Sequence, residues 1–382
     1  MRKGSSRKAP HRGSAQRSKA ERSRTNAPAL RRLLLDWYRK NRRDLPWRRS
    51  RDPYAIWISE SMLQQTRVET VIPYYQRFLE RFPDVNALAS AELEDVLGLW
   101  SGLGYYSRAR NLHRAAQRVV DEHGGTLPSD AAALRALPGV GRYTAGAVAS
   151  IAFDRCEPIV DGNIVRVLTR LFGIGEDVGT PKVLRRLWEI AAEFADGPHP
   201  GAINQALMEL GATVCARRAP RCAACPLARH CEARLRGDPE ALPVKRRKSE
   251  PRAVEAVAGW VVRRGRALAV QRPARGLLGG LWELPGGELR AGEAPAAAMQ
   301  RTLRENLGLE IGGASPLGAI EHGFTHLKLR LHVLDCPLPR GRVRLREFAA
   351  FRWLAPRSFE TLPHGVATRK ALSLLRGAAA DS

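Results

Sequence analysis

Four of the six cysteines of this 382-residue chain lie in one short segment, and their spacing constrains the fold of that segment strongly. Cys215, Cys222, Cys225 and Cys231 are separated by six, two and five residues. Zinc sites usually pair cysteines two to four residues apart, with a longer gap between the pairs, whereas iron–sulfur clusters take four thiolates at less even spacings. Residues 215–231 therefore favour a [4Fe–4S] cluster over structural zinc. Disulfides are a third interpretation, but the chain shows no apolar signal sequence and no even scatter of cysteines.

The charge balance predicts a polyanionic partner. Lys and Arg number 63 against 38 Asp and Glu, a formal net charge of +25, which is typical of proteins that bind nucleic acid. Residues 1–28 contain nine basic residues against Glu21 alone, so they carry +8 and the rest of the chain +17. With few apolar side chains to bury, this segment is expected to be a disordered basic tail.

A polar segment, residues 233–252, divides the chain into two parts of different composition. Its Gly, Pro and basic residues are typical of a linker. Before it, apolar residues recur every three or four positions, which predicts an all-α domain over 29–232. After it, short apolar runs flank one helical segment, which predicts an α+β domain over 253–374 and a C-terminal tail, 375–382. No apolar run approaches the length of a membrane span.

Individual elements can be assigned within these domains. The expected helices are 30–39, 85–99, 109–122, 130–136, 143–153, 182–194 and 294–307, and the expected strands are 256–262, 267–272, 327–334 and 348–353.

A glycine-rich turn, Leu137-Pro138-Gly139-Val140-Gly141, separates two of the expected helices. Glycines beside a helix start let backbone N–H groups approach a phosphate closely, although an ordinary helix–helix turn fits the pentapeptide equally well. Asp161 follows twenty residues after Gly141, and the cysteines follow about fifty residues later. This order of helix–hairpin–helix, aspartate and four-cysteine loop resembles the endonuclease III superfamily of DNA glycosylases.

Further motifs resemble the adenine glycosylase (MutY) family of that superfamily. They are Leu45-Pro46-Trp47-Arg48, Ser59-Glu60-Ser61-Met62-Leu63-Gln64-Gln65-Thr66 and Gly102-Leu103-Gly104-Tyr105-Tyr106, together with the α+β domain. The resemblance covers roughly residues 30–370. It implies a multidomain protein: an all-α helix–hairpin–helix glycosylase domain with an iron–sulfur loop, then an α+β Nudix-like domain. It also implies a [4Fe–4S] cofactor, a duplex DNA partner and a monomer.

Two carboxylates suffice to cleave a purine N-glycosidic bond, because the base must be protonated and the cationic sugar stabilised. Glu60 lies among apolar neighbours, and partial burial would raise its pKa and keep a proton available. The resemblance assigns Glu60 the protonation of adenine at N7. Asp161 could simply cap the next helix. The resemblance instead implies that Asp161 stabilises the sugar cation, with Asn163 and Tyr143 supporting the site.

The hairpin also indicates what the enzyme does not do. Strand-cutting relatives place a lysine there, whose amine forms a Schiff base with the sugar. This chain has Arg142-Tyr143-Thr144 instead, and a guanidinium stays protonated and is a poor nucleophile. The expected activity is therefore monofunctional.

The resemblance also assigns DNA contacts. An enzyme that acts on a paired base must extrude it. The resemblance places Gln65 and Tyr105 against the opposite base and in the stack, although an aromatic packed in a helix junction is an alternative. Thr66 is a further expected DNA contact. The expected adenine pocket comprises Trp47, Arg48 and Gln205, and a core role for Trp47 is equally open. The other expected DNA contacts are Leu137, Gly139, Gly141 and the cationic cluster-loop residues Arg217, Arg218 and Arg221. The cluster is expected to be structural.

The second domain keeps the spacing of a Nudix hydrolase box without its acids. Gly287, Glu293 and Arg301 follow that spacing, but only Glu305 remains where three acids would hold magnesium. We therefore expect the fold to be kept and hydrolysis lost. The segment Phe324-Thr325-His326 matches the family loop that senses 8-oxoguanine, with threonine where serine is common. Without the resemblance, Phe324 and His326 would be a strand-edge aromatic and a solvated histidine.

The sequence thus predicts a monofunctional glycosylase that removes adenine opposite 8-oxoguanine or guanine. The alternatives are a bifunctional glycosylase/lyase, a hydrolase of oxidised nucleotides, and a non-enzymatic iron–sulfur DNA-binding or redox-sensing protein. The expected location is cytoplasmic and nucleoid-associated. Mitochondrial import is a lesser alternative, because the Arg- and Ser-rich start resembles a transit peptide but lacks an apolar stripe.

Overall fold

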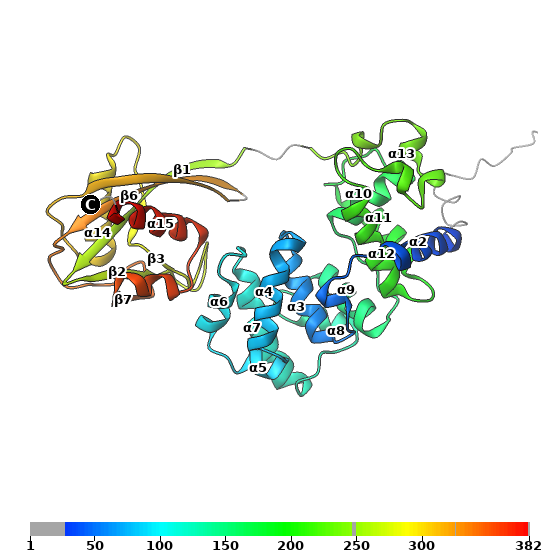
Figure 1. The fold of residues 1–382 in the computed structure, drawn as a ribbon, viewed down its shortest axis with the longest axis horizontal. Helices are drawn as coiled ribbons and strands as arrows, with labels where there is room; N and C mark the ends of the chain where they lie inside the picture. Colours follow the sequence, from blue (N-terminus) through cyan, green and yellow to red (C-terminus); the bar gives the residue numbers. More distant parts are fainter. Residues whose placement is uncertain (1–26, 247–249, 325, 381–382) are drawn as a thin grey trace, which may run out of the picture. The chain divides into compact units, whose positions relative to one another are not determined.

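The computed structural model describes residues 27–246, 250–324 and 326–380 (Figure 1). The basic tail predicted for residues 1–28 lies outside them, except for its last two residues, which begin the first described helix. None of the helices in these ranges is long and apolar enough to cross a membrane.

The chain folds into two compact units, each built from separated stretches. The described parts of Met1–Arg43 and Ala149–Arg246 form the first unit, and those of Asp44–Val148 and Arg247–Ser382 form the second. The helical domain expected over 29–232 is therefore shared between two units.

The first unit is helical. Its elements are α2 (Ala27–Asn41), α10 (Gly162–Phe172), α11 (Pro181–Ala195), α12 (Pro200–Thr213), η2 (Cys222–Ala224), η3 (Ala228–His230), α13 (Glu232–Leu235) and η4 (Pro239–Ala241). Helix α2 packs on α11 and α12, which explains why the start of the chain joins this unit.

Much of the segment predicted as a linker is packed on the first unit. Ala233 and Leu242 are buried, the Arg170 Nε donates to the Leu242 carbonyl at 2.9 Å, and the Val244 carbonyl accepts from the Val178 amide at 3.0 Å. The composition of residues 233–252 concealed this packing because only a few of its residues are apolar. The predicted linker therefore begins too early.

The second unit contains the remaining helices and the sheet. The helical elements before the sheet are η1 (Pro46–Arg48), α3 (Pro53–Leu63), α4 (Val68–Arg81), α5 (Val85–Ala89), α6 (Leu93–Trp100), α7 (Ser107–His123), α8 (Ala131–Ala136) and α9 (Arg142–Phe153), of which α9 continues into the first unit. The single helix predicted over 85–99 is two helices. The Ser90 hydroxyl donates to the Asn86 carbonyl at 2.9 Å and competes with the helical backbone at the break.

The sheet is mixed. Its strands are β1 (Arg252–Arg263), β2 (Arg266–Gln271), β3 (Trp282–Glu283), β4 (Gly286–Glu288), β5 (Ser315–Gly323), β6 (Leu327–Pro337) and β7 (Ala350–Leu354). Their order is β3-β2-β1-β6-β5, with β4 also on β1 and β7 also on β2, and only β1 and β6 pair in parallel among these strands. Arg264 and Gly265, both at positive φ, turn β1 into β2, as a tight hairpin requires.

Two helices cover opposite faces of this sheet (Figure 1). Helix α14 (Pro295–Leu307) packs on Val257 and Val261 of β1, and α15 (Val366–Ala380) packs on the face that carries Ala258. The alternation of side chains along a strand produces this two-sided burial. A short helix, η5 (Pro356–Thr361), precedes α15.

Several elements were not predicted from the sequence, among them α4, α12, β3, β4, β5 and α15. Strand β5 is mostly exposed and lacks a clear apolar alternation. Helix α15 runs to Ala380, through most of the predicted tail at 375–382, because its Leu- and Ala-rich sequence has a high helix propensity.

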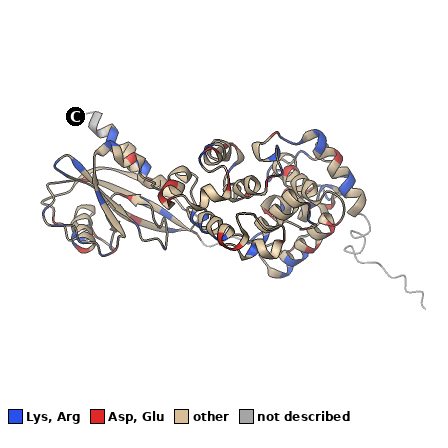
Figure 2. Ribbon diagram, turned by 90° about the horizontal axis from the view of Figure 1, so that it is seen from below, with Lys and Arg blue, Asp and Glu red and all other residues tan. Residues whose placement is uncertain are grey.

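Basic residues are spread over many elements. Figure 2 shows Lys and Arg on helices as well as strands, so the excess of positive charge is not confined to one element.

Candidate active site

Glu60 lies on a helix that is buried on all sides. Pro53 begins α3, and the Asp52 carboxylate caps it by accepting from the Tyr54 and Ala55 amides. Every residue from 54 to 62 is buried, and Glu60 is only 4% exposed. The burial expected from its apolar neighbours is therefore present, and a raised pKa for Glu60 stays a prediction.

Tyr143 contacts this carboxyl group directly. Its hydroxyl donates to the Glu60 Oε2 at 2.7 Å. A second contact joins the same helices, because the Gln64 amide donates to the Thr144 hydroxyl at 3.0 Å. The sequence-predicted residues Glu60 and Tyr143 are thus brought together at the start of α9.

The glycine turn fixes where α9 begins. Leu137 follows α8 and its carbonyl accepts from the Val140 amide, while Gly139 has a φ of +75°. A Cβ on Gly139 would also lie 2.5 Å from the Asn111 Cβ, so both conformation and space require glycine there. Gly141, by contrast, has open space around it.

In the first unit, Asp161 caps α10. Its Oδ1 accepts from the Ile164 amide at 2.7 Å, and its Oδ2 accepts from the Asn163 side-chain amide at 2.9 Å. Burial raises the pKa of Asp161, while these donors and the charge of Arg166 oppose the rise. The capping role and a catalytic role are compatible, because Asp161 remains partly exposed.

Arg166, which the sequence analysis missed, extends this group. Its Nη2 donates to the Asn163 Oδ1 at 2.8 Å and to the Gly211 carbonyl at 2.7 Å, and its Nε donates to the Cys215 carbonyl at 2.7 Å. The i, i+3 spacing from Asn163 was the only signal in the sequence. Arg166 thereby ties the Asp161 region to the cysteine loop.

The cysteine loop brings its four sulfurs into one region. Burial raises the pKa of Cys225 to about 11, and the thiols of Cys215, Cys231 and Cys222 add to the rise. Arg170 supports the loop: its Nη1 lies 3.4 Å from the Cys215 Sγ, and its carbonyl lies 3.4 Å from the Cys231 Sγ.

This arrangement can be tested against the expected cofactor. Among the described residues, no group of three or more His, Cys, Asp and Glu side chains is close enough to hold one metal ion. A single zinc ion needs each sulfur about 2.3 Å from one centre, whereas a four-iron cluster takes one thiolate per iron and fits a wider ring. The four thiols lie near enough to one another to affect the pKa of Cys225, and a [4Fe–4S] cluster at this loop stays a prediction.

The residues expected at the opposite base share an unusual backbone. Gln65 and Tyr105 have φ values of +60° and +50°, and both are exposed, Tyr105 by 43%. Left-handed conformations of such residues are uncommon and cluster at functional sites, and six other non-glycine residues of the described chain share them. Thr66 is half-buried, and its hydroxyl accepts from Arg108 at 3.2 Å.

The three residues expected around adenine differ in their burial and in the unit to which they belong. Trp47 is buried and packs edge-on against Tyr75 with ring centres 5.4 Å apart, which fits a core role. Arg48 is half-buried in the same unit. Gln205 belongs to the first unit, where its Oε1 accepts from the Tyr38 hydroxyl at 3.2 Å.

In the cationic loop, Arg217 and Arg218 are exposed. Arg221 is also exposed, but its guanidinium donates to the Thr213 carbonyl at 2.5 Å. The three residues are therefore not equivalent.

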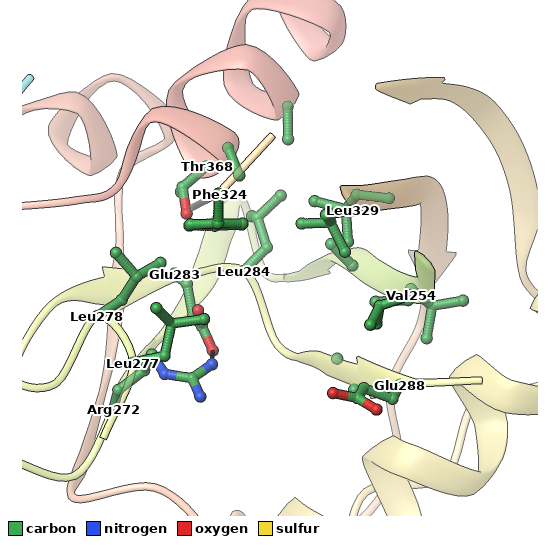
Figure 3. A pocket seen from close by; sticks show the side chains of 18 of the residues that line it. Val254, Arg272, Leu277, Leu278, Glu283, Leu284, Glu288, Phe324, Leu329 and Thr368 are labelled. Atoms are coloured by element: carbon green, nitrogen blue, oxygen red, sulfur yellow. Dashed lines mark hydrogen bonds and ion pairs between the residues drawn. The ribbon is translucent and has the colours of Figure 1, made fainter. Parts of the chain in front are cut away.

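The expected lesion-sensing segment is the turn between β5 and β6. The Phe324 amide donates to the Leu327 carbonyl at 2.8 Å, and the Phe324 ring packs edge-on against His322. Phe324 also borders a cavity of about 450 Å³ (Figure 3). His326 is exposed, and Thr325 lies outside the described residues.

The two acids that remain in the Nudix-like segment, Glu293 and Glu305, form ion pairs with arginines. Arg301 pairs with both oxygens of Glu293 at 2.7 Å and with Glu305 at 3.1 Å. Arg290 approaches Glu305 at 3.3 Å. These pairs neutralise the carboxylates that a magnesium ion would need.

Comparisons with known proteins agree with these two parts. Residues 58–193 match the HhH-GPD superfamily of base excision DNA repair proteins, and residues 257–374 match the NUDIX domain. Fold and site thus define a helix–hairpin–helix glycosylase with a Nudix-like domain. The adenine DNA glycosylase of Rattus norvegicus is 39% identical, covering 90% of this chain and 77% of the relative, and that of Homo sapiens is 38% identical, covering 91% and 74%. The chain belongs to the adenine DNA glycosylase family and is a base excision repair glycosylase.

A solved structure supports the helical part. A thermostable thymine-DNA glycosylase is 29% identical to the chain with a TM-score of 0.51, and the match covers 57% of this chain and all of the other.

Proposed function

We propose that the chain removes adenine opposite 8-oxoguanine, and opposite guanine, from duplex DNA and leaves an abasic site with the strand intact. The observation that carries the proposal is the buried Glu60 carboxyl group with the Tyr143 hydroxyl 2.7 Å away. A buried carboxyl group is suited to holding a proton near neutral pH.

Glu60 and Asp161 divide the chemistry between them. The Tyr143 hydroxyl donates to the Glu60 Oε2 and so orients the carboxyl group that carries the proton. Transfer of that proton to N7 of adenine lets the C1′–N9 bond break, with its electron pair moving to the base. Asp161, held by Asn163 and the start of α10, stabilises the positive charge on the sugar. Water then adds to C1′ and returns a proton to Glu60.

The monofunctional outcome follows from the hairpin. Tyr143 stands where strand-cutting relatives have a lysine, and its hydroxyl is engaged with Glu60. A phenol that donates to a carboxylate does not form a Schiff base with the sugar.

The cofactor and the second domain complete the proposal. Cys215, Cys222, Cys225 and Cys231 would hold a [4Fe–4S] cluster, whose contribution is to fix a cationic loop against DNA. Phe324 and His326 would read the oxidised base, with no nucleotide hydrolysis because Glu293 and Glu305 are paired to Arg301. A monomer is expected.

Single-turnover adenine release tests the proposal. Duplexes carry one A·8-oxoguanine, A·G or A·T pair, and each reaction is analysed with and without alkali. Release from the two mispairs, with strand breaks only after alkali, is the expected result. Breaks without alkali, or a borohydride-trapped adduct, would indicate a lyase. No release despite tight binding by cluster-loaded protein would favour a DNA-binding sensor.

A further inference from the structure

The side chain of Arg108, near the start of α7, reaches two loops of the second unit. Its Nη1 donates to two carbonyls of the last turn of α3, Ser61 at 2.9 Å and Met62 at 2.7 Å, and to the carbonyl of Gln64, which follows the helix, at 2.7 Å. One nitrogen thus contacts the three carbonyls that lead into Gln65.

The other terminal nitrogen of Arg108 bridges to the loop that precedes α7. Its Nη2 donates to the Gly104 carbonyl at 3.1 Å and the Leu103 carbonyl at 3.5 Å, and also to the Thr66 hydroxyl at 3.2 Å. A single guanidinium therefore joins the loop of Gln65 to the loop of Tyr105.

Aromatic rings hold this guanidinium in place. Its central carbon lies 5.3 Å from the centre of the Trp100 ring and 5.4 Å from that of Tyr105. The Arg108 backbone amide also donates to the Tyr105 carbonyl at 2.9 Å. Burial lowers the pKa of Arg108 to about 10, so the group is still cationic at neutral pH.

Each of the two loops presents one exposed residue with a left-handed backbone. Gln65 and Tyr105 adopt positive φ without being glycine, and such conformations persist only where the surroundings hold them. The Arg108 hydrogen bonds end on carbonyls immediately before each residue, at Gln64 and Gly104.

We infer that Arg108 is a positioning residue that fixes Gln65 and Tyr105 relative to each other, so that both enter the duplex at the mispair as one rigid unit. This inference rests on the proposed function for the contact with DNA. The geometry requires arginine, because its planar fork reaches acceptors on two sides, whereas a lysine ammonium is a compact charge at the end of a flexible stem.

Hydrogen exchange of the free protein tests the positioning role without DNA or activity. Arg108→Lys is expected to speed amide exchange by about tenfold in residues 61–66 and 101–106, with α11 unchanged. Arg114→Lys is the matched control, since Arg114 is exposed on the same helix and contacts Asn111. Unchanged exchange in both loops would overturn the inference. If Arg108→Lys does not fold, Thr66→Val removes one Nη2 acceptor and should loosen the same loops less.

A rate comparison tests the consequence for the reaction. Arg108→Lys should slow single-turnover adenine release about 100-fold in an otherwise native chain. In a chain that also carries Gln65→Ala and Tyr105→Ala, Arg108→Lys should slow adenine release less than about threefold, because the residues that Arg108 positions are gone. Equal losses in both backgrounds would make Arg108 a general structural residue. If the native chain releases no adenine, the proposed function fails, while the exchange experiment still decides the positioning role.

Discussion

At the scale of single residues, base release depends on a proton held by Glu60 and oriented by Tyr143. Replacing Glu60 by Gln keeps the shape but removes the acid, so single-turnover release should fall by about 100-fold or more. Tyr143→Phe removes the hydrogen bond to the carboxylate that forms as Glu60 gives up its proton, and release should fall by about 10- to 100-fold. Duplex affinity, measured by titration, should stay nearly constant in both variants. Release at the native rate from Glu60→Gln would remove its assignment as the acid.

Asp161 sets the acid side of the pH dependence. Its ionised form is needed to stabilise the sugar, and burial raises its pKa above the ordinary value. The rate should therefore begin to fall on acidification at a higher pH than an ordinary aspartate would give. The Asn163 amide, 2.9 Å from the carboxylate, lowers this pKa, so Asn163→Ala should shift the acid limb further toward neutral pH. An acid limb that stays in place after this substitution would contradict the assignment.

At the scale of helices, Gly211 of α12 lets the neighbouring helix α10 approach. A Cβ at this position would lie 2.6 Å from the Asn163 Cβ and 3.1 Å from its backbone. Gly211→Ala should lower the free energy of unfolding by about 1–3 kcal/mol through overpacking, despite alanine's better helix propensity. Adenine release should also slow, because Asn163 holds Asp161.

A control for this prediction lies in the other unit. Gly98 of α6 has no atom within 4 Å of an added Cβ, and Gly98→Ala should raise the free energy of unfolding by up to about 1 kcal/mol. Denaturant titration of both variants separates helix propensity from close packing. Equal effects of the two substitutions would mean that Gly211 is not a contact point.

Helix α14 is anchored by the ion pair of Arg301 and Glu293. The guanidinium of Arg301 holds the pKa of Glu293 down to about 2, below its ordinary 4.5. A carboxylate with a lowered pKa contributes stability that is full above pH 4.5 and is lost as the pH falls toward 2. The melting temperature of the native chain should therefore drop over this interval, and that of Arg301→Gln should drop less. Arg304→Gln, exposed on the same helix, should behave as the native chain does. The same fall of melting temperature with pH in the native chain and both variants would exclude the ion pair as a stabilising contact.

At the scale of the whole molecule, the sequence predicted helices and strands better than the contacts between them. The apolar neighbours of Glu60 indicated its burial, and the hairpin glycines indicated where α9 starts. Arg108, Arg166 and Arg170 could not be predicted, because most of their partners are backbone carbonyls that carry no signature in the sequence. The joining of α2 to α11 and α12 in one unit could not be predicted either, because packing between helices far apart in the chain leaves no local pattern. The iron–sulfur cluster and the lesion specificity stay predictions.

The net charge of +25 predicts binding that weakens steeply with salt, because each neutralised phosphate releases a counterion. Arg217 and Arg218 are exposed beside the cysteines, so replacing either by Ala should reduce the slope of log affinity against log salt by about 0.9. Arg221→Ala should instead disturb the loop, because this guanidinium holds the Thr213 carbonyl. Lys182→Ala, exposed on α11, is the control and should leave the slope unchanged. An unchanged slope in both arginine variants would place the cysteine loop away from DNA.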